Sequence, residues 1–125
     1  MEPENAQLRI LVVDDDADAC DILSQVLKHL GHEPECLQDS AEALSRIRRE
    51  QFDLILLDLV MPGLSGFDLL RAVKAGPAAP KAVVAVSSYN EFRHTARDAG
   101  FHAFVDKPVE LGKLRRLLET ALPAT

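Results

Sequence analysis

The sequence predicts an α/β domain in which a parallel sheet of five strands lies between two layers of helices. Two observations lead to this fold class. Short apolar segments alternate five times with longer segments whose apolar residues recur at helical spacing. Runs such as ILVV and LILL are apolar on both faces, which is typical of strands buried in a parallel sheet. Parallel strands need crossover helices, and right-handed crossovers allow helices on both faces of a doubly wound sandwich.

The five expected strands differ in how clearly the sequence marks them. Leu8–Val13, Asp53–Leu57 and Lys81–Val86 are short and mainly apolar. Glu33–Leu37 is a weak second strand because charged residues interrupt it, and the fifth strand, His102–Val105, is short. No internal repeat or second domain accompanies these strands, so we expect one domain.

A helix is expected after each strand. The first lies in DDDADACDILSQVLKHLG, where Gly31 is placed as the C-cap. The second, DSAEALSRIRRE, begins with Asp39 and Glu42 at the spacing of a capping box. The others lie in GFDLLRAVKA, in the short EFRHTARDAG and in ELGKLRRLLETAL. The residues of the first and last helices that should face inward are Ala19, Ile22, Leu23, Val26, Leu27, Leu30, Leu111, Leu114, Leu117, Leu118 and Ala121.

The composition restricts the class of partner. The net charge of −6 argues against a surface for nucleic acid or for an anionic membrane. No apolar run reaches transmembrane length, and the N-terminal residues MEPENAQ are polar and acidic, unlike a signal peptide. The cytoplasm is therefore the expected compartment. Cys20 and Cys36 lie in apolar-periodic segments without a CxxC or Cys/His pattern, so we expect two small buried free thiols.

Polar side chains follow the strands at one edge of the expected sheet. Asp14 and Asp15 follow the first strand, Asp58 follows the third, Ser87 the fourth and Lys107 the fifth. In open α/β sheets, ligands bind outside the carboxyl ends of the strands. We therefore expect three carboxylates, a hydroxyl and an amine to converge there.

This set of groups points to phosphoryl transfer. Three neighbouring carboxylates repel one another unless a cation binds between them. Mg²⁺ takes oxygen ligands and commonly combines a few carboxylates with phosphate oxygens. A nucleophilic aspartate, a hydroxyl and a lysine complete a site that can position and neutralise a moving phosphoryl group. Each residue also has a simpler explanation, since strand-end acids often cap turns or helices, and we expect Asp16 to act mainly as such a cap.

The motifs ILVVDDD, LILLDLVMPGLSGFDLL, AVSS and DAGFHAFVDKPVEL occur in this order over nearly the whole chain. Together they resemble the receiver (CheY-like) domain of two-component response regulators. The resemblance implies a flavodoxin-like (βα)5 sandwich with strand order 2-1-3-4-5. It also implies a receiver domain over residues 8–122, after a disordered N-terminal tail over residues 1–7.

The resemblance assigns a role to each residue of the motifs. Asp58 corresponds to the phosphoacceptor, with Ser87 and Lys107 as the catalytic partners that contact the phosphoryl group. The metal ligands would be Asp15, Asp58 and the backbone carbonyl of Val60, with Asp14 acting through water, and the cofactor would be Mg²⁺ or also Mn²⁺. Ser87 and Phe104 would form the switch, which the rotamer of Phe104 reports. Pro62, Gly63 and Pro108 would shape the loops, and the Lys107–Pro108 bond would be cis.

The resemblance implies a signalling switch and no turnover enzyme. The phosphoryl donor would be a sensor histidine kinase or a histidine phosphotransfer protein. The 125 residues contain no helix-turn-helix, so the output is expected to be a protein contact on the face of the fourth helix, fifth strand and last helix. The protein would be a monomer or weak dimer that binds neither nucleic acid nor membrane. It would be either a free-standing regulator or a receiver from a longer chain such as a hybrid kinase.

Two other functional classes compete with the switch. A phosphorylation-independent interaction module with the same fold is the main alternative, although its site would be expected to lose at least one of these groups. A phosphatase of the haloacid-dehalogenase type needs DxDx[TV], whereas Asp58 is followed by Leu59 and Val60. A P-loop is absent from the sequence.

Two positions and the length of one segment depart from the commonest pattern of the family. Ser88 stands where a smaller residue is usual, and Val60 where polar residues are frequent. The segment from Ser87 to Lys107, which contains the fourth helix, is about two residues shorter than in many relatives. Because the position of Val60 tunes attack by water in the family, we expect a long-lived phosphoryl state.

Overall fold

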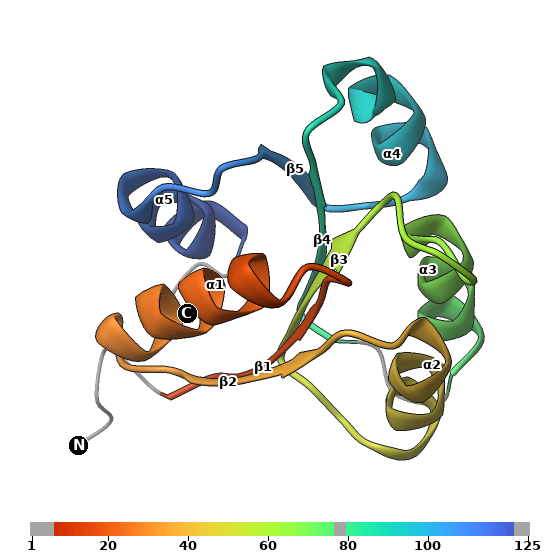
Figure 1. The fold of residues 1–125 in the computed structure, drawn as a ribbon, viewed down its shortest axis with the longest axis horizontal. Helices are drawn as coiled ribbons and strands as arrows, with labels where there is room; N and C mark the ends of the chain where they lie inside the picture. Colours follow the sequence, from red (N-terminus) through yellow and green to blue (C-terminus); the bar gives the residue numbers. More distant parts are fainter. Residues whose placement is uncertain (1–6, 77–79, 122–125) are drawn as a thin grey trace.

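The structure, a computed structural model, describes residues 7–76 and 80–121 and has the predicted sheet (Figure 1). Five parallel strands pair in the order β2-β1-β3-β4-β5, which confirms the expected topology. The strands are β1 (Arg9–Val13), β2 (Glu33–Leu37), β3 (Leu54–Asp58), β4 (Ala82–Ser87) and β5 (Ala103–Asp106). The tail predicted over residues 1–7 lies, apart from Gln7, outside the described residues.

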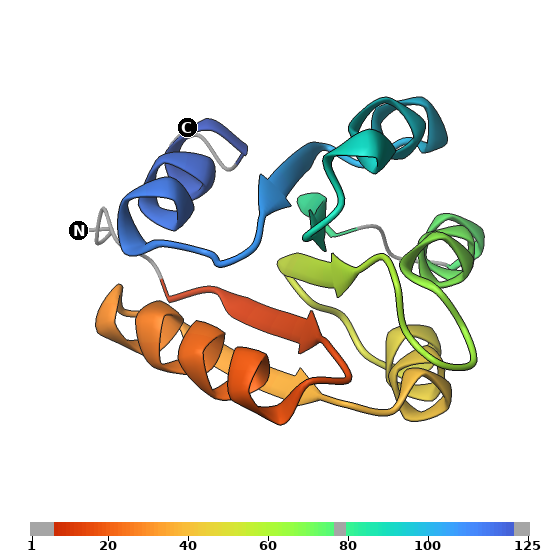
Figure 2. The same cartoon turned by 45° about the horizontal axis from the view of Figure 1, so that its top comes forward.

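Helices cover both faces of the sheet, as expected. They are α1 (Ala17–His29), α2 (Ser40–Arg49), α3 (Gly66–Ala75), α4 (Arg93–Ala99) and α5 (Leu111–Ala121), with a 3₁₀ turn, η1 (Asn90–Phe92), before α4. Figures 1 and 2 show α1 and α5 on one face and α2, α3 and α4 on the other. No helix of the described chain has both the length and the apolar character needed to span a membrane.

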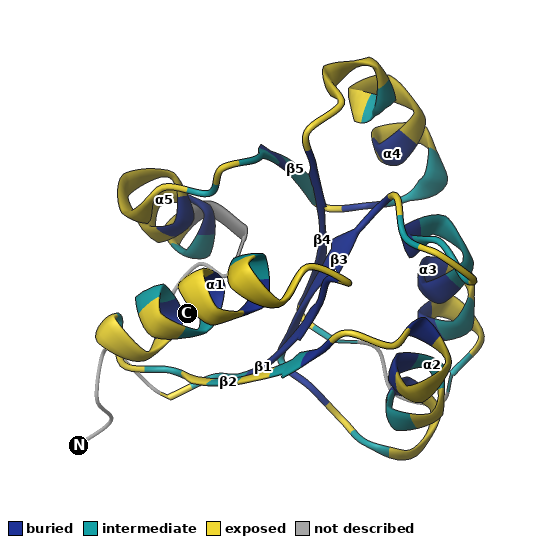
Figure 3. Cartoon of the chain, in the orientation of Figure 1, coloured by how far each residue is buried: buried dark blue, intermediate teal, exposed yellow. Residues whose placement is uncertain are grey.

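Each face of the sheet has its own apolar core. One core joins the sheet to α2, α3 and α4, and the other joins it to α1 and α5. Every residue of β3 and β4 is buried, and the helices turn their buried sides toward these strands (Figure 3). Two expected core residues are instead solvent-facing, since Ile22 is 55% exposed and Leu111 37% exposed. Both lie on helices that pack against the rest of the protein with one side only. The apolar residues of each helix therefore cover a wider arc than the side that is buried.

Three strands extend one residue further than the sequence predicts. Asp58, Ser87 and Asp106 are the last residues of β3, β4 and β5, because backbone pairing continues through them. The N–H of Leu59 donates to the carbonyl of Val86 over 3.1 Å, and the N–H of Lys107 donates to the carbonyl of Ser87 over 3.0 Å. The sheet's hydrogen bonds therefore fix the polar residues at this edge.

The expectation of two free thiols is wrong. Cys20 of α1 and Cys36 of β2 form a disulfide, with their Cα atoms 5.7 Å apart. Cys20 is buried and Cys36 is half-buried. The pair forms because α1 packs directly against the edge strand β2, a tertiary contact that a separation of 16 residues does not reveal.

The opposite, amino-terminal edge of the sheet carries a network of ion pairs. Arg9 and Arg46 both pair with Glu50, and Arg46 also pairs with Glu35 over 2.5 Å. The guanidinium of Arg9 lies 4.5 Å from the centre of the Phe52 ring, a cation–π contact. This amino-terminal network links β1, β2 and α2.

Candidate functional site

Three carboxylates meet at the carboxyl edge of the sheet. Asp14 follows β1 directly and is 1% exposed, Asp58 ends β3 and is 6% exposed, and Asp15 is exposed. Each offers a carboxylate oxygen, and these three oxygens lie within 4.8 Å of one another. The convergence of these three acids, inferred from the strand ends, is confirmed.

Backbone contacts hold the loop that carries the first two acids. The N–H of Asp14 donates to the carbonyl of Leu37 at the end of β2 over 3.1 Å. The Asp14 carboxylate in turn accepts the N–H of Asp16 over 3.0 Å. Asp16 is the N-cap of α1 and accepts from the N–H of Asp18, as expected. Asp15 therefore projects from a short turn between β1 and α1.

Lys107 brings the ammonium group to the carboxylates. Its Nζ lies 2.7 Å from Oδ2 of Asp14 and donates a hydrogen bond to Oδ2 of Asp58 over 3.2 Å. Its backbone is fixed by the bond to Ser87, and the Lys107–Pro108 peptide bond is cis, as the resemblance implied. Lys107 thus bridges the two buried acids.

One ammonium does not compensate the charge of the acids. Burial raises the pKa of Asp58 to about 6, and the charge of Asp14 adds to this shift against the opposing effect of Lys107. Burial alone would lower the pKa of Lys107, but its contacts with Asp14 and Asp58 outweigh burial and raise it. The site accordingly favours additional positive charge.

The donor set fits a small hard cation. Oδ2 of Asp14 is buried, and among the described residues its ion pair with Lys107 is not accompanied by a hydrogen bond. Asp15 offers an exposed carboxylate beside it. An all-oxygen cluster with a partly open side is the chemistry that Mg²⁺ prefers in proteins, and Mn²⁺ accepts the same ligands.

The loop after Asp58 is held close to the acid. The N–H of Val60 donates to Oδ1 of Asp58 over 3.2 Å, and the Val60 side chain is 48% exposed. Gly63 has a φ of +79°, a conformation that favours glycine and that agrees with a turn at this position. Pro62 is exposed in the same turn, and its carbonyl accepts from the Ser40 hydroxyl over 3.4 Å.

Two residues that shape this loop were not singled out from the sequence. Ser40, the first residue of α2, also accepts the N–H of Leu64 through its hydroxyl over 3.0 Å. At Gly66 a Cβ atom would lie 2.6 Å from the Asp58 carbonyl oxygen, so only glycine lets α3 start so close to β3. Neither leaves a local signal, because both roles depend on contacts between distant segments.

Ser87 and Phe104 lie on the two strands beyond Asp58. Ser87 is buried one position past Val86, the residue paired with Asp58, and its hydroxyl accepts the N–H of Tyr89 over 3.0 Å. Phe104 is half-buried on β5, and the guanidinium of Arg93 lies 4.6 Å from its ring centre. Ser87 therefore ends the strand beside that of Asp58, whereas Phe104 lies one strand further on and contacts Arg93 of α4.

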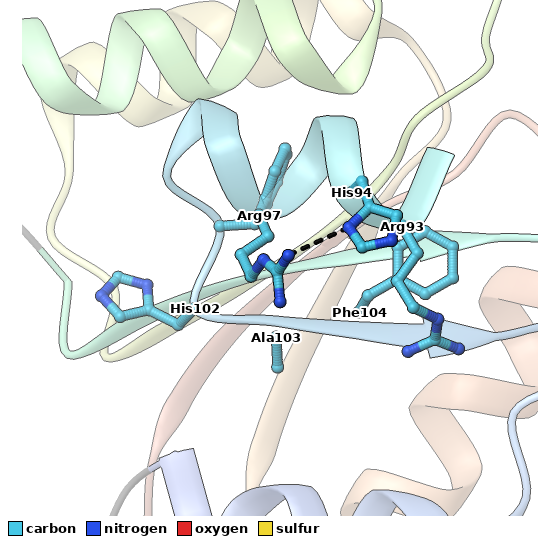
Figure 4. A pocket seen from close by; sticks show the side chains of 7 residues that line it. Arg93, His94, Arg97, His102, Ala103 and Phe104 are labelled. Atoms are coloured by element: carbon cyan, nitrogen blue, oxygen red, sulfur yellow. Dashed lines mark hydrogen bonds between the residues drawn. The ribbon is translucent and has the colours of Figure 1, made fainter. Parts of the chain in front are cut away.

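A small pocket lies on the side of α4 and β5, with a volume of about 190 Å³ (Figure 4). Four of its lining residues carry basic or titratable side chains. They are Arg93, His94, Arg97 and His102, and Phe101, Ala103 and Phe104 complete the wall. Arg93 also pairs with Asp106 at the end of β5 over 3.1 Å, so the Asp106 carboxylate is engaged on this side of the sheet.

Comparisons with known proteins agree with this geometry. The family described as response regulator receiver domain matches residues 10–119. The transcriptional regulatory protein ZraR of Salmonella typhimurium is 34% identical over 120 residues, which are 95% of this chain and 27% of that protein. The chain thus spans about a quarter of the length of that relative.

Two solved structures share the fold over most of their length. A CheY-like receiver domain protein from Methanospirillum hungatei is 32% identical, with a TM-score of 0.80 over 93% of this chain and 94% of that one. The response regulator TrrA of Thermotoga maritima, in complex with Mg²⁺ and BeF, is 27% identical, with a TM-score of 0.81 over 91% and 98%. With its family match, strand order and acid cluster, the chain belongs to the response regulator receiver domains.

Proposed function

We propose that this receiver domain is a phosphorylation-activated switch in which Asp58 accepts a phosphoryl group in a Mg²⁺-dependent reaction. The observation that carries the proposal is the buried cluster of Asp14 and Asp58 bridged by Lys107 and flanked by the exposed Asp15. Receiver domains are generally signalling domains, which agrees with a single transfer followed by slow reversal rather than with enzymatic turnover. The relative TrrA supports the cofactor, since its structure is a complex with Mg²⁺ and BeF.

The cation would be held by Asp15, by Asp58 and by the backbone carbonyl of Val60, with Asp14 acting through water. When bound, Mg²⁺ neutralises charge on the transferred phosphoryl oxygens. The protein's own groups do the rest. The Val60 N–H fixes Oδ1 of Asp58, and a carboxylate oxygen attacks phosphorus while the bond to the donor breaks. Lys107, already 3.2 Å from Oδ2, then pairs with a phosphoryl oxygen.

The donor is proposed to be a sensor histidine kinase or a histidine phosphotransfer protein, in the cytoplasm. After transfer, the doubly charged phosphoryl group would draw the Ser87 hydroxyl away from the Tyr89 N–H, so that Ser87 donates to a phosphoryl oxygen. Movement of Ser87 would free space at the end of β4, toward which Phe104 can turn. These two residues are the proposed switch.

The output surface is proposed to be the face formed by α4, β5 and α5. Arg93 connects this face to the switch, because it lies over the Phe104 ring and pairs with Asp106. A change in the Phe104 rotamer would therefore move Arg93 and reshape the pocket of Figure 4. The downstream partner is a protein that reads this change, and the chain itself acts as a monomer or weak dimer.

Intact-mass measurement with Mg²⁺ and acetyl phosphate tests the acceptor. The wild type should gain one phosphoryl group, EDTA should prevent the gain, and Asp58→Asn should show none. If a folded wild type that binds Mg²⁺ gains nothing, the same assay with a panel of phosphorylated histidine kinases decides the matter. No transfer from any donor would contradict the switch and would favour the phosphorylation-independent interaction module.

Val60 is proposed to prolong the phosphorylated state. Its exposed apolar side chain stands two residues after Asp58, where it cannot orient an attacking water by hydrogen bonding. Val60→Asn supplies such a group and should shorten the lifetime of the aspartyl phosphate several-fold. Dephosphorylation followed by mass after removal of acetyl phosphate measures this lifetime, and equal rates in both proteins would refute the role.

A further inference from the structure

The disulfide between Cys20 and Cys36 lies beside the acid cluster. Cys20 is in the first turn of α1, four residues after the N-cap Asp16, and its N–H donates to the Asp16 carbonyl over 3.0 Å. Its sulfur lies 3.4 Å from the backbone oxygen of Asp14. One end of the disulfide therefore contacts the loop that carries the acids.

The other end of the disulfide holds the same loop from β2. Cys36 precedes Leu37, whose carbonyl accepts the N–H of Asp14 over 3.1 Å. The backbone of Asp14 thus contacts Cys20 through its oxygen and the neighbour of Cys36 through its nitrogen. The S–S bond therefore links two segments that together position Asp14 and, next to it, Asp15.

The two cysteine residues differ in exposure. Cys20 is 2% exposed, whereas Cys36 is half-buried on β2, an edge strand of the sheet. A thiolate from solution can therefore approach Cys36 more readily than Cys20. In a cytoplasmic protein, the compartment proposed above, a disulfide is usually transient and redox-sensing rather than permanently structural.

We propose that Cys20 and Cys36 form a reversible thiol–disulfide exchange site whose oxidised form strengthens cation binding at Asp14, Asp15 and Asp58. A low-molecular-weight thiolate such as that of glutathione attacks the Cys36 sulfur, and Cys20 leaves as a thiolate that takes a proton from water. A second glutathione thiolate attacks the glutathione sulfur of the mixed disulfide and releases Cys36. Two glutathione thiols are oxidised to one glutathione disulfide, and the protein disulfide is reduced to two thiols.

The coupling rests on the proposed cation site and is necessarily reciprocal. If oxidation raises the affinity for Mg²⁺ by some factor, saturating Mg²⁺ must shift the dithiol–disulfide equilibrium toward the disulfide by the same factor. We expect oxidation to raise the Mg²⁺ affinity about fivefold, at the low end of the range for coupled sites, because oxidation leaves the acids themselves unchanged. The two measurements are independent, since one follows the heat of binding and the other counts thiols.

The test uses the wild-type protein in both redox forms. Calorimetric titration with Mg²⁺ gives the affinity of each form, and alkylation followed by intact mass gives the reduced fraction in mixtures of reduced and oxidised glutathione, with and without Mg²⁺. The expected result is weaker Mg²⁺ binding by the reduced form and a matching shift of the glutathione equilibrium toward the protein disulfide when Mg²⁺ is present. Equal affinities, or a pair that never oxidises in this buffer, would overturn the proposal.

Cys36→Ser serves as the matched control, because it removes the disulfide while retaining Cys20 against Asp14. It should bind Mg²⁺ as the reduced wild type does, whatever the glutathione ratio. A Cys36→Ser protein that keeps the affinity of the oxidised wild type would also overturn the coupling. Failure of both wild-type forms to bind Mg²⁺ would overturn the proposed function as well, whereas equal binding by both forms would leave that function intact.

Discussion

The two edges of the sheet use the same kinds of charged residue for different purposes. At the amino-terminal edge, Arg9 and Arg46 balance Glu35 and Glu50, and all four side chains are at least partly exposed. At the carboxyl edge, Asp14 and Asp58 are buried with Asp15 beside them, and Lys107 is their cation. The first arrangement is satisfied as it stands, whereas the second has excess negative charge. This difference identifies the carboxyl edge as the part of the sheet where binding of a cation would lower the free energy of the folded protein.

The largest expected effect is at Asp58. The pKa of the Asp58 carboxyl rises from 3.8 to about 6 on folding, so its ionised form destabilises the folded protein. After allowance for solvent screening, Asp58→Asn should stabilise the cation-free protein by about 2 to 3 kcal/mol at neutral pH. The folded wild type binds this proton more tightly than the unfolded chain does. Wild-type stability therefore falls relative to Asp58→Asn as pH rises between about 4 and about 6.

Urea unfolding of both proteins in EDTA at several pH values measures this difference. Asp98→Asn is the matched control, because Asp98 is an exposed aspartate of α4 and should change little at any pH. Saturating Mg²⁺ should reduce or reverse the advantage of Asp58→Asn. A variant that is less stable than the wild type in EDTA at every pH would show that the acids are not in conflict.

Lys107 should give an effect of opposite sign. Lys107→Met removes the cation between Asp14 and Asp58, so we expect a loss of roughly 1 to 2 kcal/mol in EDTA, after allowance for partial exposure of the lysine. Added Mg²⁺ should recover part of the loss, because it restores positive charge to the same carboxylates. Lys113→Met, at an exposed position of α5, is the control for thermal or urea unfolding. A loss that Mg²⁺ leaves unchanged would point to packing instead of charge.

Asp15 should affect ligand binding more than stability. It is exposed, so Asp15→Asn should change the cation-free stability little but weaken Mg²⁺ binding at least about tenfold, as losses at metal sites commonly do. Asp21→Asn makes the same charge change at an exposed position of α1 and should leave the affinity nearly unchanged. Calorimetric titration compares the three proteins. Equal losses in both variants would mean that Asp15 acts only through net charge.

The contrast between the edges also explains what the sequence could predict. Apolar strands that lead into Asp14 and Asp58 are recognisable in the sequence, and the rule that parallel strands share a carboxyl edge brings these acids together without further information. The burial of Ser40, the close approach at Gly66 and the Cys20–Cys36 bond depend on how α2, α3 and α1 pack. Those contacts join segments that carry no shared pattern, so the sequence did not indicate them.

The amino-terminal network provides the smallest expected effect. Hydrogen bonds from Arg46 and Arg9 hold the pKa of Glu50 at about 2, well below its usual value. Because this pKa is lowered on folding, the ion pairs contribute stability above about pH 4.5, and the contribution is lost as pH falls toward about 2. Glu50→Gln should therefore be slightly less stable than the wild type at neutral pH and equal to it in strong acid.

The effect of Mg²⁺ on the stability of the variants should distinguish the amino-terminal edge from the carboxyl edge. Mg²⁺ should leave the difference between Glu50→Gln and the wild type unchanged, since the network has no excess charge for a cation to neutralise. Glu33→Gln, at an exposed position of β2, controls for the loss of one negative charge. Thermal unfolding with Mg²⁺ and with EDTA makes the comparison. If Mg²⁺ altered the effect of Glu50→Gln as it should alter that of Lys107→Met, the two edges would be coupled through the sheet, and their division into a stabilising and a ligand-binding end would be wrong.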